Sequence, residues 1–356
     1  MTTPLIDLSA HARGTGPQRR AIERALDEHL RHTGFLLVAG HGVDATLIQQ
    51  TRTMAGRFFA LGDDAKGSFS PVADGAPGYY PLATGSLAAT LGEDGPPDPK
   101  ESFTTGPLTD GSGGDPALAR WFPPTRWPDV PGFAGTWTAY HRAMDRLATS
   151  LLALFARALD LPEGRFAAAC RNPTSTLSAV HYPGGGSPEG MRAGAHSDYG
   201  TLTVLHKQPG ADDLEVRMPD GTWSRLRPAT DVFVVNTGDL LAQWTNDRWV
   251  STVHRVVVPE GGSRPSLSLG FFHQPDADAL VEALPSCVTA DNPARYAPVL
   301  AGEHLAAKMT RQHSTAAPCS RNPGTNGGSS GDRGPAPSAR AVVWSCGGRR
   351  PPGPAG

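Results

Sequence analysis

The sequence has no clustered cysteines, no excess of one charge and no long apolar run. Its four cysteines are scattered through 356 residues without C-x-x-C spacing, which argues against a zinc ribbon or a disulfide framework and suits a reducing cytoplasm. A formal net charge of −2 provides no basic field for nucleic acid. No apolar stretch approaches the ~20 residues of a membrane span, and the N-terminus lacks the features of a signal peptide. We therefore expect a cytoplasmic globular protein that binds neither nucleic acid nor membranes.

The first part of the chain, about 1–170, has the pattern of helices joined by long loops. Apolar residues recur at helical spacing in 17–33, and the short apolar stretch "FLLVAGHGV" that follows predicts a buried strand. A second helix comes next, with Asp44 as its expected N-cap. Residues 62–130 are rich in Gly, Pro, Asp and Ser, which is typical of loops that cover a site. The most regular helical pattern lies between 133 and 162.

From about 174 to 275 the apolar pattern changes to a period of two. Short strand-like stretches alternate with turn signals such as "PDG", "NDR" and "EGG", which indicates a β-sandwich or barrel, such as a jelly roll. A last helix is expected at about 301–313, so we predict one domain over 1–313. Glycine and proline fill 16 of the 43 positions of 314–356, and this composition predicts a disordered tail.

A candidate metal site begins in "GAHSDYGTLTVL", where a histidine and an aspartate stand one residue apart. Residues two apart on a strand face the same way, so His196 and Asp198 can reach one point. His254, in the later strand-like stretch "WVSTVHRVVVP", is the candidate third ligand. Two histidines and one carboxylate with open positions are the ligand set of non-haem Fe(II) oxygenases. Ligand type alone does not encode the metal, so a zinc hydrolase is an alternative.

A candidate carboxylate site follows in "SRPSLSLGFF", where Arg264 and Ser266 are two residues apart. On a strand both would face one side, and a guanidinium beside a hydroxyl can bind a carboxylate through charge-assisted hydrogen bonds. Tyr182, at the end of the strand-like stretch "SAVHYPG", could donate its hydroxyl to the same carboxylate. The alternatives are a solvated edge-strand arginine and a tyrosine that is satisfied locally.

The order H-x-D, H and R-x-S, with "HYP" upstream and "VNTGDLLAQWTNDRWVSTVHRV" between, resembles the Fe(II)/2-oxoglutarate-dependent dioxygenases of the isopenicillin N synthase-like group. The resemblance spans about residues 3–313 and includes "PLIDLS", "GFLLVAGHGV", "DPKESFTTG" and "AGEHLAAKM". It implies a mainly β fold with flanking helices, built on a double-stranded β-helix (jelly-roll) core. It also implies Fe(II) on the residues that match His196, Asp198 and His254. By the same resemblance, Arg264, Ser266 and Tyr182 match the residues that bind the far carboxylate of 2-oxoglutarate.

Two departures from the family pattern bear on the co-substrate. Val180 stands where many plant members have an asparagine that contacts it. Isopenicillin N synthase itself keeps the R-x-S pair but uses it on a peptide substrate, without 2-oxoglutarate. The pair therefore predicts carboxylate binding more firmly than it predicts which carboxylate is bound.

The sequence thus predicts a non-haem Fe(II) oxygenase that couples decarboxylation of 2-oxoglutarate, with O2, to hydroxylation, desaturation or cyclisation of a small organic substrate. The resemblance also suggests antibiotic biosynthesis. A 2-oxoglutarate-independent oxidative cyclase and a catalytically silent jelly-roll binding protein are the alternatives. We expect a monomer.

Residues around the site receive weaker assignments. Asn236 and Asp239, in "VNTGD", are expected to secure a turn near the metal. Tyr79, Tyr80 and Phe103, in the loop-rich region, are expected either to line the substrate site or to serve structure alone.

Overall fold

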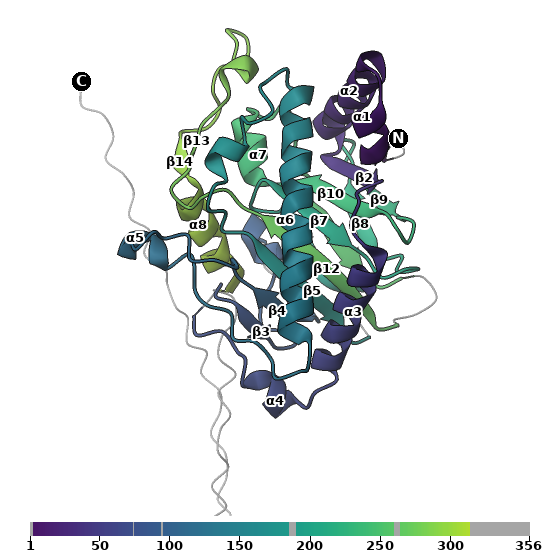
Figure 1. The fold of residues 1–356 in the computed structure, drawn as a ribbon, viewed down its shortest axis with the longest axis vertical. Coiled ribbons are helices and arrows are strands. Elements are labelled where there is room, and N and C mark those ends of the chain that lie inside the picture. The colour runs from purple at the N-terminus through teal and green to yellow at the C-terminus, as the bar shows by residue number, and fades with distance from the viewer. Residues whose placement is uncertain (1–2, 74, 94, 185–189, 260–263, 314–356) are drawn as a thin grey trace, which may run out of the picture. The chain divides into compact units, whose positions relative to one another are not determined.

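A computed structural model describes residues 3–73, 75–93, 95–184, 190–259 and 264–313; the segment predicted as a tail lies outside these residues. Figure 1 shows the arrangement. The helices are α1 (Leu8–Arg13), α2 (Gly16–His32), α3 (Ala45–Phe59), α4 (Asp63–Gly67), α5 (Pro116–Ala119), α6 (Phe133–Ala158), α7 (Asp239–Trp244) and α8 (Ala301–His313), with short 3-10 turns η1 (Ala88–Leu91), η2 (Ala167–Ala169) and η3 (Pro285–Cys287). The strands are β1 (Leu5–Asp7), β2 (Phe35–Ala39), β3 (Gly78–Tyr80), β4 (Glu101–Thr105), β5 (Thr176–Tyr182), β6 (Met191–His196), β7 (Leu202–His206), β8 (Leu214–Arg217), β9 (Trp223–Leu226), β10 (Phe233–Thr237), β11 (His254–Val257), β12 (Ser266–His273), β13 (Leu280–Val281) and β14 (Val299–Leu300).

Two sheets form the core. The larger has eight strands in the order β1-β2-β10-β7-β12-β5-β4-β3, and the smaller has four in the order β6-β11-β8-β9. One buried cluster joins them, because Phe35, Tyr182 and Val234 of the large sheet pack with Val216 and Val256 of the small sheet. Two mainly antiparallel sheets that enclose a common interior are a jelly roll, so the predicted fold class is confirmed.

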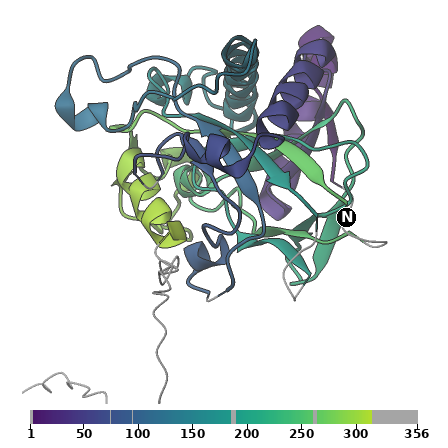
Figure 2. The same cartoon turned by 90° about the horizontal axis from the view of Figure 1, so that it is seen from below.

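Helices cover the outer face of the large sheet (Figures 1 and 2). In α6, Trp137, Met144 and Leu151 are fully buried at helical spacing, and each such side chain stabilises the fold by roughly 1.5–3 kcal/mol. His141 of the same helix lies edge-on to Phe271 of β12, with 5.1 Å between the ring centroids. The helix predicted between 133 and 162 is therefore confirmed as a helix packed along a sheet.

Strand β4 has two chemically different faces. Phe103 is fully buried against Trp137 of α6, with 5.7 Å between ring centroids, and the Trp137 indole N–H donates to Thr105 Oγ1 at 3.2 Å. Alternate residues of a strand face opposite sides, so Ser102 and Thr104 face the interior of the jelly roll. This alternation separates residues that build the core from residues that can meet a ligand.

Of the two roles expected for Tyr79 and Phe103, the structure supports the structural one and not the lining of the substrate site. Both side chains belong to the core beneath the helices, where they are 4% and 0% exposed, and the Tyr79 hydroxyl donates to Glu101 at 2.6 Å. Tyr80, on the opposite face of β3, does line the cavity described below. The sequence pattern identified the aromatic residues of this region as candidates, but it did not predict which face of each strand packs against α6.

No helix in the described part of the chain is both long and apolar enough to cross a membrane.

Cys170 and Cys287 are free thiols. Burial raises the pKa of the Cys170 thiol to about 12, so it stays protonated and unreactive at neutral pH.

Candidate metal centre and adjoining cavity

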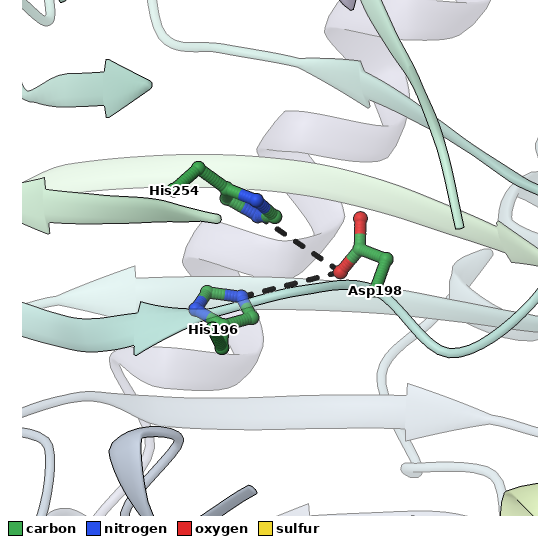
Figure 3. Close-up of side chains that lie close together, drawn as sticks. All are labelled: His196, Asp198 and His254. Carbon is green, nitrogen blue, oxygen red and sulfur yellow. Dashed lines mark ion pairs between the residues drawn. The ribbon is translucent and has the colours of Figure 1, made fainter. Parts of the chain in front are cut away.

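Three side chains converge between the two sheets (Figure 3). His196 is the last residue of β6, Asp198 follows in the next loop, and His254 is the first residue of β11. Asp198 Oδ1 lies 4.0 Å from His196 Nε2 and 3.9 Å from His254 Nε2. One ligand atom from each residue lies within 4.8 Å of the other two, and all three residues are buried. The structure thus brings together the three predicted metal ligands.

The route by which they meet differs from the prediction. His196 and Asp198 do not share a strand face, because β6 ends at His196 and Asp198 belongs to the loop before β7. His254 is instead the direct cross-strand partner of His196 in the antiparallel pair β6–β11. The turn after β6 then brings the carboxylate to the two imidazoles.

Backbone carbonyls fix the orientation of both imidazoles. His196 Nδ1 lies 2.8 Å from the Gly194 carbonyl and His254 Nδ1 lies 3.2 Å from the Thr252 carbonyl. A carbonyl can only accept, so in these contacts Nδ1 carries the proton and Nε2 presents its lone pair to the centre of the cluster. This is the state in which an imidazole binds a metal ion.

The carboxylate is oriented in the same manner. Asp198 Oδ2 accepts hydrogen bonds from Asn236 Nδ2 and Thr203 Oγ1, both at 2.6 Å, which leaves Oδ1 toward the histidines. The expected place of Asn236 next to the metal ligands is therefore confirmed. Asp239 secures the adjoining turn as expected, because its backbone N–H donates to the Asp198 carbonyl at 2.8 Å, and its carboxylate forms an ion pair with Lys308 of α8 at 2.6 Å.

The electrostatics of the cluster suit a cation. Burial acts to raise the pKa of Asp198, but the two neighbouring imidazoles and the bonds from Asn236 and Thr203 outweigh it and hold that pKa below the ordinary value. Burial, followed by the proximity of His254, lowers the pKa of His196. An ionised carboxylate and a neutral imidazole are what a divalent metal needs from its ligands, so the donor set fits Fe(II).

The predicted carboxylate site is only partly assembled. Ser266 and Tyr182 are buried cross-strand partners on β12 and β5, whereas Arg264 is exposed. The guanidinium beside Ser266 belongs to Arg192, which is 1% exposed and donates from Nη1 to Ser266 Oγ at 3.0 Å. A second donation, from Nη2, reaches the Arg264 carbonyl.

Arg192 belongs to a buried charge cluster that the sequence did not reveal. Its Nη1 lies 3.3 Å from Asp213 Oδ2, and Lys207 Nζ donates to the other oxygen of Asp213. All three residues are at most 5% exposed, so Arg192 and Lys207 are buried cations that share the carboxylate of Asp213. Period-two spacing does not reveal Arg192, because the pairing of β6 with β11 shifts register between His196 and Met191 and so breaks the alternation of faces along β6.

A cavity of about 200 Å³ opens beside His196 and Asp198. It is bounded by the inner faces of β4 and β5, by the end of β12, by residues near η1 and by α8. Leu305 and Met309 of α8 border one side, and the Tyr199 hydroxyl donates to Gln312 of the same helix at 2.9 Å. The metal cluster therefore faces a cavity in which a small ligand can lie.

Known proteins match both the sequence and this geometry. The model of the 2OG-Fe(II) oxygenase superfamily matches residues 173–275, and that of the N-terminal region of non-haem dioxygenases in morphine synthesis matches residues 3–130. Validamycin A dioxygenase of Streptomyces hygroscopicus subsp. limoneus is 32% identical over 313 residues, 86% of each chain. The chain belongs to the 2OG-Fe(II) oxygenase superfamily. Homoarginine-6-hydroxylase 2-ODD-233 of Oryza sativa subsp. japonica is 31% identical to this oxygenase over 81% of its length and 88% of the relative's.

Solved structures agree with this assignment. The oxygenase superposes on a full-length Neurospora crassa protein, solved in complex with α-ketoglutarate and thymine, with a TM-score of 0.76 and 26% identity, covering 86% of this chain and 96% of that one. A putative 2OG-Fe(II) oxygenase family protein from Caulobacter crescentus gives a TM-score of 0.74 at 29% identity, with coverage of 86% and 98%. The prediction of an Fe(II)/2-oxoglutarate-dependent dioxygenase that uses iron, 2-oxoglutarate and O2 is confirmed.

Proposed function

We propose that His196, Asp198 and His254 are the iron ligands of this dioxygenase and that the cavity beside them holds its organic substrate. The supporting observation is the convergence of three ligand atoms within 4.8 Å, each oriented by a further hydrogen bond. Bound Fe(II) would supply the O2 chemistry that decarboxylation of 2-oxoglutarate drives. The chain's own part is to present two neutral imidazoles and one carboxylate on one side of the ion, which leaves the other side open.

The co-substrate site is proposed at Ser266 and Tyr182, with Arg264 at its rim as the family resemblance implies. Arg192 adds a buried guanidinium 3.0 Å from Ser266 Oγ. A carboxylate that enters beside Ser266 would accept charge-assisted hydrogen bonds from this buried guanidinium. The far carboxylate of 2-oxoglutarate supplies such a group.

The substrate is a small molecule, and its identity belongs to this proposal. The relative at 32% identity is named for validamycin A, which makes that compound one to assay and is consistent with a role in antibiotic biosynthesis. We also propose a monomeric, cytoplasmic enzyme that acts without nucleic acid or membrane. The near-neutral formal charge and the two free thiols support this part of the proposal.

Anaerobic titration of the protein with Fe(II) and 2-oxoglutarate tests the site. We expect a visible charge-transfer band in the wild type and its loss in His196→Ala. Oxygen consumption should then be accompanied by release of succinate and CO2. Oxygen consumption without succinate would instead support the oxidative cyclase that takes all its electrons from the substrate, and an active His196→Ala variant would contradict the assignment of the ligands.

A further inference from the structure

The inner face of the large sheet carries hydroxyl groups where it borders the cavity. Ser102 and Thr104 of β4 and Thr176 and Ser178 of β5 all line this space, and we call these four residues the hydroxyl wall. The strands are in register, with Thr104 opposite Ser178. The residues between them face the helices, as the fully buried Leu177 shows.

The wall keeps hydrogen-bonding capacity for a ligand. Thr104 Oγ1 and Ser178 Oγ lie 2.8 Å apart and share one hydrogen bond, whereas two hydroxyls carry two donor hydrogens and four lone pairs. Gly270 of β12 stands opposite Ser178 on its other side, and the Phe272 ring lies over Gly270. Burying hydroxyls without partners is unfavourable, so a ligand that fits here must itself present hydroxyl, ether or amide groups.

Charge beside the wall is balanced. The charged side chains that border the cavity apart from the metal cluster are Asp98 and Lys100, which form an ion pair at 3.2 Å. Asp98 also accepts hydrogen bonds from the backbone N–H groups of Leu87 and Gly194, at 3.0 and 2.8 Å. Among the described residues that line the cavity, each charge outside the metal cluster is already paired. A cationic or anionic substrate would therefore meet no available opposite charge there.

Apolar surface lies beside the wall. The Phe272 ring borders the cavity near Thr176, its cross-strand partner, and Leu305 and Met309 approach from α8. A polyhydroxylated ring has hydroxyls around its edge and C–H groups on its faces, so one such molecule can satisfy both kinds of surface. A flat hydrocarbon would leave the remaining hydrogen-bonding capacity of the wall unused.

We infer that the substrate of this oxygenase is an uncharged ring polyol, either a sugar or cyclitol by itself or the terminal unit of a larger glycoside, bound at the hydroxyl wall. This inference rests on the proposed function, since the hydroxyl wall lines the same cavity as His196 and Asp198. A cavity of about 200 Å³ suits one ring of this kind.

The first test uses the anaerobic enzyme loaded with Fe(II) and 2-oxoglutarate. The probes are myo-inositol, methyl glucoside and maltose, set against L-homoarginine, thymine and indole-3-acetate. We expect at least one polyol to perturb the charge-transfer band and to accelerate succinate release when O2 is admitted. Response only to the charged, flat or apolar probes would overturn the inference, and so would no response to any of the six. Failure of the band to form at all would overturn the proposed function instead.

The second test changes the wall without changing its shape. In the double variant Thr104→Val/Ser178→Ala both partners of the 2.8 Å bond are removed together, so neither is left alone. We expect the KM for the responsive polyol to rise about tenfold or more, while the KM for 2-oxoglutarate and the charge-transfer band stay unchanged. Thr53→Val, an exposed position on α3, is the matched control. An unchanged polyol KM in the double variant would overturn the inference.

Discussion

Arg192 donates a hydrogen bond to Ser266 across the interior of the jelly roll, over 3.0 Å, and both residues are buried. One residue comes from the small sheet and the other from the large sheet. The contact therefore places a guanidinium where the family resemblance expects Arg264 alone, and it has a direct consequence for the co-substrate.

Replacing Arg192 should weaken binding of 2-oxoglutarate. A charge-assisted hydrogen bond to a carboxylate contributes about 1.5–3 kcal/mol, so Arg192→Gln should raise the KM for 2-oxoglutarate by roughly 10- to 150-fold, and Arg192→Lys should raise it less. Steady-state succinate release at varied 2-oxoglutarate measures this effect. Arg217→Gln, at an exposed position of β8, is the control. An Arg192→Gln enzyme with the wild-type KM would show that Arg264 acts without it.

Removing Asp213 should make stability depend on 2-oxoglutarate. Asp213→Ala leaves Arg192 and Lys207 buried without their shared carboxylate, which costs about 3–5 kcal/mol. Bound 2-oxoglutarate would replace that negative charge. Anaerobic thermal unfolding with Fe(II) should therefore show a lower Tm and a larger rise on adding 2-oxoglutarate than in the wild type. Asp278→Ala, at an exposed position, should behave like the wild type, and an equal rise in Asp213→Ala would refute the charge argument.

Loss of the Asn236 amide should weaken iron binding. Asn236 Nδ2 donates to Asp198 at 2.6 Å and helps to point the other carboxylate oxygen at the imidazoles. Changes to such supporting residues cost about 10- to 100-fold in metal affinity. Anaerobic Fe(II) titration should show this loss in Asn236→Ala and not in Asn172→Ala, which lies on the surface. Equal affinity in both variants would show that Thr203 alone orients the carboxylate.

Glu101 should make the fold sensitive to acid. Burial acts to raise its pKa, but hydrogen bonds from His181, Lys66 and Tyr79 outweigh burial and lower the pKa from 4.5 to about 2. A carboxyl with a lowered pKa contributes stability that is present above its unfolded pKa and is lost as the pH falls toward its folded pKa. The loss falls between about pH 4.5 and 2 and amounts to about 3 kcal/mol.

Urea unfolding at several pH values tests this assignment. Glu101→Gln should be less stable than the wild type at pH 7, because Lys66 loses its buried partner. The same variant should show a shallower decline in stability on acidification. Glu28→Gln, an exposed residue of α2, should follow the wild-type pH dependence. A Glu101→Gln curve parallel to the wild type would place the acid-sensitive group elsewhere.

Local pattern was enough to predict much of the fold. The helical spacing of Trp137, Met144 and Leu151 predicted α6, and the period of two after residue 174 predicted the strands of the jelly roll. The metal cluster was also predictable, because the order of His196, Asp198 and His254 along the chain is a property of the sequence. Local spacing did not reveal how they meet, since that depends on where β6 ends and how β11 pairs with it.

Contacts between the sheets lay beyond the sequence pattern. Lys207 and Asp213 lie six residues apart in the connection between β7 and β8, and the fold brings Arg192 of β6 beside Asp213 and beside Ser266 of the large sheet. The same reason explains Phe103, whose side of β4 is set by its contact with Trp137. Period-two spacing shows that a strand has two faces, but a distant element decides which face is the core.

The direct pairing of His196 with His254 makes iron binding a check on strand registration. A slip of β11 by one residue against β6 would turn every side chain of β11 to the opposite face, so His254 would leave the cluster at the same time as Val256 left the core. A chain misfolded in this way could not assemble the three ligands. Iron would then stabilise only molecules in which β6 and β11 are paired in the native register. The fraction of molecules that bind Fe(II) would therefore measure the fraction with correctly aligned strands.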